Sequence, residues 1–130
     1  MVIQKQSKLL TLHSPNGRST LLQLIPEGET ITAVDYNPIG RYFIFARKRQ
    51  NGGRIEIISI QSSQLVSRTI FSCNVKRTES LAVDWRGENV YWTDSHKGTI
   101  EVVQIKEKFR MVLHKNLDTP KAIAVQPDLG

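Results

Sequence analysis

Short apolar runs separated by polar turn residues follow one another along most of the chain. The runs are rich in β-branched and aromatic residues, which is typical of strands, and almost none has the period of a helix. Representative runs are "GRYFIFA", "RIEIISI", "GENVYWTD", "GTIEVVQI" and "KFRMVLH". Between two of them, Asn51-Gly52 predicts a tight hairpin turn because both residues tolerate positive φ. The pattern predicts an all-β protein.

A repeat groups these strands into units of similar length. "ITAVDYNPIGRYFIFA" aligns with "SLAVDWRGENVYWTD", and "RIEI" aligns with "TIEV". The matching alanines are Ala33, Ala82 and Ala124, which are separated by 49 residues (82 − 33) and 42 residues (124 − 82). Periods of this size, with four strands in each, are typical of β-propeller blades. The extra residues of the longer unit fall in its loops, where insertions are tolerated.

One complete blade can be followed along the chain. We expect Leu81–Trp85 to be its inner strand, Asn89–Asp94 the second, Thr99–Ile105 the third and Phe109–His114 the outer strand. Ala122–Val125 would open the next blade. A single antiparallel meander cannot bury both of its faces, so it has to stack against neighbouring blades.

The order "LAVDW", "VYWTDS", "IEVV" and "TPKAIAV" closely resembles the YWTD repeats, or class B repeats, of the low-density lipoprotein receptor family. The resemblance implies a six-bladed β-propeller in an extracellular receptor ectodomain, usually flanked by EGF-like modules. Such a propeller has no catalytic activity and no cofactor. It binds protein ligands or packs against neighbouring modules.

With this resemblance the expected fold is all-β, a partial β-propeller of about three four-stranded antiparallel blades. Residues 1–30 would be an incomplete N-terminal blade, 31–79 a degenerate YWTD-type blade, 80–121 a YWTD blade, and 122–130 the start of the next. In the degenerate blade Ala46 stands where the signature has Asp. Half a propeller leaves apolar blade faces uncovered, so we expect a fragment of a longer parent, or a chain of low stability as a monomer.

Two sets of residues are candidate sites. The resemblance gives a structural role to Tyr91, Trp92, Thr93, Asp94, Asp84 and Lys121, and Asp94 would bond to backbone across a blade boundary. Asp35, Asp84 and Asp94 are also candidate catalytic or Ca²⁺-binding carboxylates. Because they recur at the ends of predicted strands, an architectural role is the simpler interpretation, and no metal site is predicted.

Basic residues form the second set. The net charge is +6, which suits an acidic partner. In a propeller, the loops from the second to the third strand and from the outer strand to the next blade emerge on one face. Those loops carry Arg47, Lys48, Arg49, Arg54, Lys76, Arg77, Lys97 and Lys115, whereas the opposite face has mixed charge. This face is the candidate binding surface for a protein ligand or an acidic or sulfated partner.

Other functional classes find less support. A propeller hydrolase or lactonase would need several carboxylates around a metal in a central channel, and an intracellular WD-type scaffold would need Gly-His and Trp-Asp pairs that do not occur here. No phosphate-binding loop or nucleic-acid module is recognisable. The single cysteine, Cys73, permits no internal disulfide and is expected to be a small buried residue. No signal peptide or membrane span is recognised in this chain.

Overall fold

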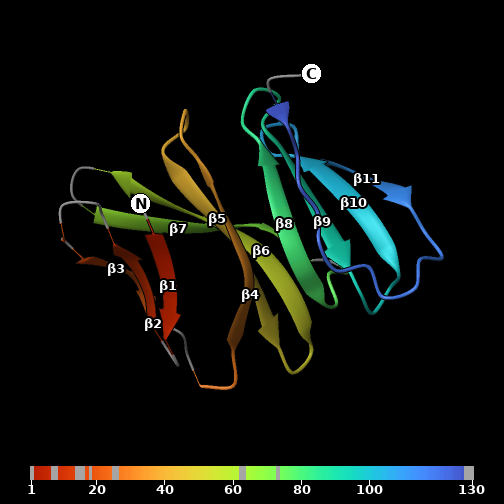
Figure 1. The fold of residues 1–130 in the computed structure, drawn as a ribbon, viewed down its shortest axis with the longest axis horizontal. Coiled ribbons are helices and arrows are strands. Elements are labelled where there is room, and N and C mark those ends of the chain that lie inside the picture. The colour runs from red at the N-terminus through yellow and green to blue at the C-terminus, as the bar shows by residue number, and fades with distance from the viewer. Residues whose placement is uncertain are drawn as a thin grey trace.

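The computed structural model of the chain describes residues 2–6, 9–13, 17, 19–24, 27–61, 64–72 and 74–127 (Figure 1). Cys73 lies outside these residues. Within the described part, the regular structure is built from strands. They are β1 (Val2–Gln6), β2 (Leu9–His13), β3 (Ser19–Leu24), β4 (Thr30–Asn37), β5 (Tyr42–Arg49), β6 (Gly52–Gln61), β7 (Gln64–Phe71), β8 (Thr78–Asp84), β9 (Asn89–Asp94), β10 (Thr99–Gln104) and β11 (Phe109–His114).

The strands form three antiparallel meanders. β1–β3 make a three-stranded sheet, β4–β7 a four-stranded sheet and β8–β11 a second four-stranded sheet, each in chain order. Figure 1 shows the three sheets side by side, with β1–β3 at the left and β8–β11 at the right. The first strands of the second and third sheets, β4 and β8, contact each other. This is a partial β-propeller, which confirms the predicted fold class.

The main core lies between the second and third sheets. Trp92 on β9 is fully buried there. Other members of this cluster are Ile44, Ala46, Ile55, Ile57, Ile70, Leu81, Val83, Val90, Val103 and Ile105. The two sheets therefore bury the apolar faces that neither meander can cover alone.

The second sheet is apolar on both faces. Successive residues of a strand point to opposite sides, so Ile44 and Ala46 of β5 join the main core while Phe45 lies on the other face. There Phe45 packs in a separate cluster with Ile31 and Ile58. This arrangement explains the near-continuous apolar run "YFIFA", because the central sheet has a neighbour on each side.

The β5–β6 hairpin differs from the prediction by one residue. Arg49 pairs with Gly52, so the two turn residues are Gln50 and Asn51. Gly52 has φ 129°, and an added Cβ would lie 3.3 Å from the carbonyl oxygen of Val75. Glycine is required here because side chains rarely adopt this backbone conformation and the β7–β8 loop passes close by.

The segment expected to open the next blade is not a strand. Residues 121–126 have no regular secondary structure, although Ile123 bonds to Ser80 on β8. A strand needs a hydrogen-bonded neighbour, and no described strand forms a ladder with Ala122–Val125. Ala122–Val125 is therefore not a strand in this chain, and its place at the start of a next blade stays a prediction.

Candidate functional site

Asp94, at the end of β9, holds the loop between the second and third sheets. Its side chain is fully buried and accepts hydrogen bonds from the backbone N–H groups of Lys76 at 2.8 Å and Arg77 at 3.2 Å. It also accepts from the N–H groups of His96 at 3.2 Å and Lys97 at 3.1 Å in its own turn. One carboxylate thus positions two loops that carry basic side chains.

The other repeated carboxylates also bond to backbone donors. Asp35 on β4 accepts from the N–H groups of Val83 on β8 and of Tyr36, both at 2.8 Å. Asp84 accepts from Arg86 N–H at 3.1 Å and Gly87 N–H at 3.2 Å, which closes the β8–β9 turn. Among the described residues, no group of three or more His, Cys, Asp or Glu side chains is arranged to hold a metal ion.

The segment after β11 is attached to the third sheet. Thr93 Oγ1 donates to the backbone carbonyl of Lys121 at 2.8 Å. The Lys121 side chain itself is exposed, so its contact with the sheet is made through its backbone. Tyr91 is half-buried on β9, between Ala82 of β8 and Val102 of β10.

Three loops of the predicted basic face come together. Gly53 N–H donates to Val75 C=O at 2.8 Å, which joins the β5–β6 hairpin to the β7–β8 loop. Ser95 N–H donates to Arg77 C=O at 3.0 Å, which joins that loop to the β9–β10 turn. These backbone bonds fix the loops of two sheets next to each other.

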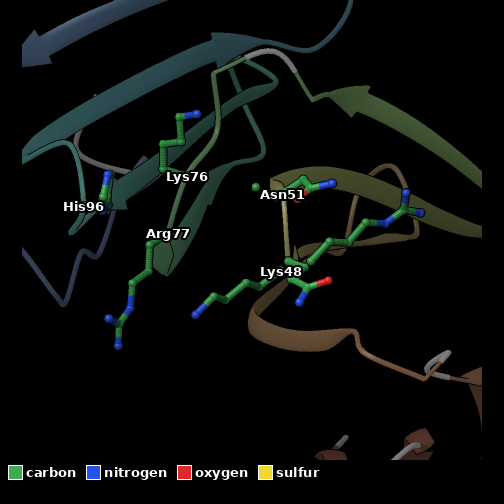
Figure 2. A pocket seen from close by; sticks show the side chains of 8 residues that line it. Lys48, Asn51, Lys76, Arg77 and His96 are labelled. Carbon is green, nitrogen blue, oxygen red and sulfur yellow. The ribbon is translucent and has the colours of Figure 1, made fainter.

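An open cavity of about 300 Å³ lies between these loops. Its lining residues are Lys48, Arg49, Gln50, Asn51, Gly52, Lys76, Arg77 and His96. Figure 2 shows Lys48 from β5 extending toward the side of the cavity where Arg77 of the β7–β8 loop and His96 lie, with Arg77 pointing downward in this view. We call this cavity the basic cavity.

Half of the eight predicted ligand-face cations line the basic cavity. They are Lys48, Arg49, Lys76 and Arg77, and all four are exposed. Arg49 Nε lies 2.5 Å from Glu29 Oε1, and Arg77 Nε lies 2.9 Å from Glu79 Oε1. The sequence interpretation did not include His96 in this face, because a lone loop histidine carries no signal of its own.

Arg47 and Arg54 do not line the basic cavity. The Arg47 side chain is only 3% exposed and lies 2.7 Å from Glu29 and 3.1 Å from Glu56. Arg54 lies 2.7 Å from Glu56. Arg47 pairs with Arg54 in the β5–β6 register, so both arginines reach the same two carboxylates. Both arginines are therefore paired with glutamates, and Arg54 stays partly exposed.

The charged side chain of Lys97 is also paired with groups of the protein. Its Nζ donates to Glu101 Oε2 at 3.0 Å and to the Asn74 carbonyl at 3.1 Å. Lys115 is exposed just after β11 but does not line the basic cavity. The structure therefore does not bring these two residues to the cavity.

Glu101 on β10 is a polar centre that the sequence interpretation missed. It is fully buried, and Arg110 contacts it through Nε at 2.9 Å and Nη2 at 2.7 Å. Burial raises the pKa of Glu101, but hydrogen bonds from Arg110, Thr99 and Lys97 outweigh burial and hold the pKa below its usual value. The sequence does contain a signal for this buried glutamate, because the alignment of "RIEI" with "TIEV" places Glu56 and Glu101 at the same repeat position.

Arg110 connects this centre to the neighbouring sheet. Its guanidinium lies 4.3 Å from the ring centre of Phe71 on β7 and 5.1 Å from that of Trp92. Arginine stacks on aromatic faces while its planar fork binds a carboxylate. The Glu101–Arg110 pair thus ties the third sheet to the outer strand of the second.

Part of the chain matches a known protein family. Residues 88–127 match the family model described as low-density lipoprotein receptor repeat class B. The matched segment includes β9–β11 and both the Asp94 and Glu101 centres, and its His96 lines the basic cavity.

A curated relative carries the same type of sequence. Low-density lipoprotein receptor-related protein 5 of Mus musculus is 45% identical over 53 residues, which cover 40% of this chain and 3% of that protein. The aligned part thus spans a small fraction of the relative.

Solved structures resemble the whole fold. A chain in the crystal structure of a nidogen/laminin complex matches with a TM-score of 0.83 and 21% identity, over 98% of this chain and 49% of that chain. A manganese-bound oligogalacturonate lyase matches with a TM-score of 0.63 and 16% identity, over 82% of this chain and 29% of the lyase. At these identities the likeness shows the fold alone. No helix in the described residues is long and apolar enough to cross a membrane.

Proposed function

We propose that this chain is a non-enzymatic, ligand-binding segment of a low-density lipoprotein receptor-type ectodomain propeller, on the outside of the cell. The class B repeat and the similarity to a receptor-related protein support this class. The occurrence of a similar fold in a nidogen/laminin complex supports a role in contacts with other molecules. The partner, a protein or a sulfated molecule, carries negative charge and binds the basic loop face.

The observation that carries the proposal is the basic cavity. Lys48 and Lys76 are exposed and pair with no carboxylate of the described residues, while Arg49 and Arg77 each meet one glutamate. A cavity of about 300 Å³ is roughly 7 Å across, which is shorter than the screening length of about 8 Å at physiological ionic strength. The cations on its walls therefore act together on an anion placed between them.

The geometry of the carboxylates supports a non-catalytic role. General acid–base chemistry needs a carboxyl group within hydrogen-bond reach of the substrate. The repeated carboxylates Asp35, Asp84 and Asp94 instead accept hydrogen bonds from backbone donors. Their positions suit the holding of strands and loops in a blade.

A neighbouring blade or an EGF-like module of a longer parent would contact the third sheet. β11 exposes large apolar side chains along its length, and they continue into the segment that follows. They are Phe109, Met111, Val112, Leu113 and Leu117. Contiguous exposed apolar surface of this kind is characteristic of an interaction site.

Charge reversal on two faces tests the proposal. The full chain carrying Lys48→Glu with Lys76→Glu would be compared with Lys106→Glu with Lys108→Glu, in the exposed β10–β11 turn on the opposite face. Poly-L-glutamate serves as the acidic probe, and its affinity is measured by calorimetry at several salt concentrations. We expect the loop-face pair to weaken binding more than the turn pair. Equal losses would mean that only net charge matters, and the proposal would be rejected.

A further inference from the structure

The basic cavity is one of a row of open depressions along the loop face. A second cavity of about 460 Å³ shares Arg49, Asn51 and Gly52 with it, and a third of about 400 Å³ shares Arg77 and His96. A fourth of about 360 Å³ shares Lys48, Arg49 and Gln50. Because they share lining residues, the four cavities adjoin one another across the loops of two sheets, and we call them together the groove.

The lining of this groove is polar throughout. Beyond the basic cavity, the lining residues are Gly28, Thr30, Gly53, Arg54, Thr69, Ser72, Glu79, Ser95, Thr119 and Lys121. Apart from the imidazole of His96, none of the side chains that line the four cavities is aromatic, and none is aliphatic beyond the methyl groups of threonine. Hydroxyl, amide and cationic groups donate hydrogen bonds to the oxygens of sulfate, carboxylate and sugar hydroxyl groups.

This composition discriminates between classes of partner. Energetically dominant residues in protein–protein interfaces are large anchors such as Trp, Tyr and Arg set in apolar pockets, and interface cores are depleted in Lys. Single-stranded nucleic acids stack their bases on aromatic side chains. The groove has arginines and lysines but no apolar pocket, and the single imidazole of His96 gives no series of rings for successive bases, so it favours neither of those partners.

The cations are arranged to receive anionic groups. Lys48 of β5 and Arg77 of the β7–β8 loop both line the basic cavity, where no carboxylate is among the lining residues (Figure 2). Glu29 and Glu79 meet Arg49 and Arg77 at Nε, which orients each guanidinium. The terminal nitrogens of such a fork bind a sulfate or carboxylate in a bidentate manner.

We propose that this groove binds a linear sulfated polysaccharide, with its anionic groups placed in successive cavities. The inference rests on the proposed function and specifies the chemistry of the partner at the loop face. A polysaccharide chain supplies anions at regular intervals and hydroxyl groups between them. Both features match a row of cationic cavities joined by threonine, serine and asparagine.

Binding of the full chain to heparin oligosaccharides of increasing length tests the inference. If several cavities are filled in turn, affinity should rise from the disaccharide to the dodecasaccharide. A de-sulfated dodecasaccharide of equal length should bind far more weakly. Affinity that is independent of length, or of sulfation, would overturn the inference.

Variants that replace lysine by neutral glutamine test whether the groove is the binding site. Lys48→Gln with Lys76→Gln removes two exposed cations and should weaken dodecasaccharide binding about tenfold, since an exposed ion pair contributes up to about 1 kcal/mol. Taking the counterion release found for single-stranded polyanions, the slope of log K against log salt should fall by about 1.4. The matched control, Lys106→Gln with Lys108→Gln, should change affinity less than about twofold. An equal loss in both pairs would overturn the inference, and equal thermal melts exclude misfolding.

Poly-L-glutamate separates this inference from the proposed function. If the groove variants lose binding to polyglutamate but not to the dodecasaccharide, the loop face binds acidic protein, and only the polysaccharide inference fails. If they lose binding to neither probe, both fail. A loss of binding to both probes, larger for the sulfated dodecasaccharide, supports the inference.

Discussion

At the scale of single residues, buried carboxylates hold the loops on which binding depends. Asp94 accepts four backbone hydrogen bonds, and two of them come from the β7–β8 loop. Asp94→Ala leaves these donors without an acceptor in a buried site, so the free energy of unfolding should fall by about 1–3 kcal/mol. Urea denaturation measures this change, with Asp118→Ala in the exposed segment after β11 as control. A variant as stable as the wild type would contradict the structural role of Asp94.

Glu101 makes folding sensitive to acid. Its pKa is lowered in the folded state because the hydrogen bonds from Arg110, Thr99 and Lys97 outweigh the effect of burial. The stability from these bonds is present above the unfolded value of 4.5 and is lost as pH falls through the lower folded pKa. Melting temperatures measured from pH 7 downward should therefore drop steeply below this value.

Replacement of Glu101 tests the origin of this acid limb. Glu101→Gln leaves Arg110 and Lys97 without their carboxylate, and breaking such a buried pair costs about 3–5 kcal/mol at neutral pH. The same change should flatten the pH dependence, whereas Glu107→Gln in the exposed β10–β11 turn should leave it unaltered. An acid limb that is as steep in Glu101→Gln as in the wild type would assign it to other groups.

At the scale of elements, the β5–β6 hairpin shapes the basic cavity. Gly52 combines φ 129° with close approach to Val75 C=O. Gly52→Ala should therefore cost about 1–3 kcal/mol and displace the turn that carries Gln50 and Asn51. Asn51→Ala, at an exposed neighbouring position, should cost much less. Chemical denaturation of both variants checks this, and equal stabilities would show that the hairpin tolerates a side chain at Gly52.

At the scale of the whole molecule, uncovered blade surface controls association. Met111 and Leu113 on β11 are 48% and 39% exposed, and β11 is also an edge strand. Exposed apolar patches and unpaired strand edges drive self-association, so sedimentation should show association that increases with protein concentration. Met111→Lys with Leu113→Lys should reduce it, whereas Ile39→Lys, at an isolated exposed turn position, should not. A monomer at all concentrations would contradict this prediction.

The sequence by itself determined the strands, the meanders and the class B repeat. Alternation of side chains, turn residues and the spacing of Ala33, Ala82 and Ala124 are local or periodic properties, which can be read without coordinates. The strand predicted at Ala122–Val125 is not formed, because this segment has the composition of a strand but no described neighbour with which to pair. Strand composition was therefore sufficient only where a partner strand was also present.

Only the tertiary structure decided which cations remain available to a partner. Arg47 and Arg54 are bound by Glu29 and Glu56, and Lys97 is bound by Glu101. Lys48 of β5 and Arg77 of the β7–β8 loop, which are far apart in the sequence, line one cavity. Strand register, backbone bonds between loops and the packing of one sheet on another set these distances, and none of them is a property of neighbouring residues in the chain. The electrostatic field of the loop face depends on such distances, so residue counts alone could not predict it.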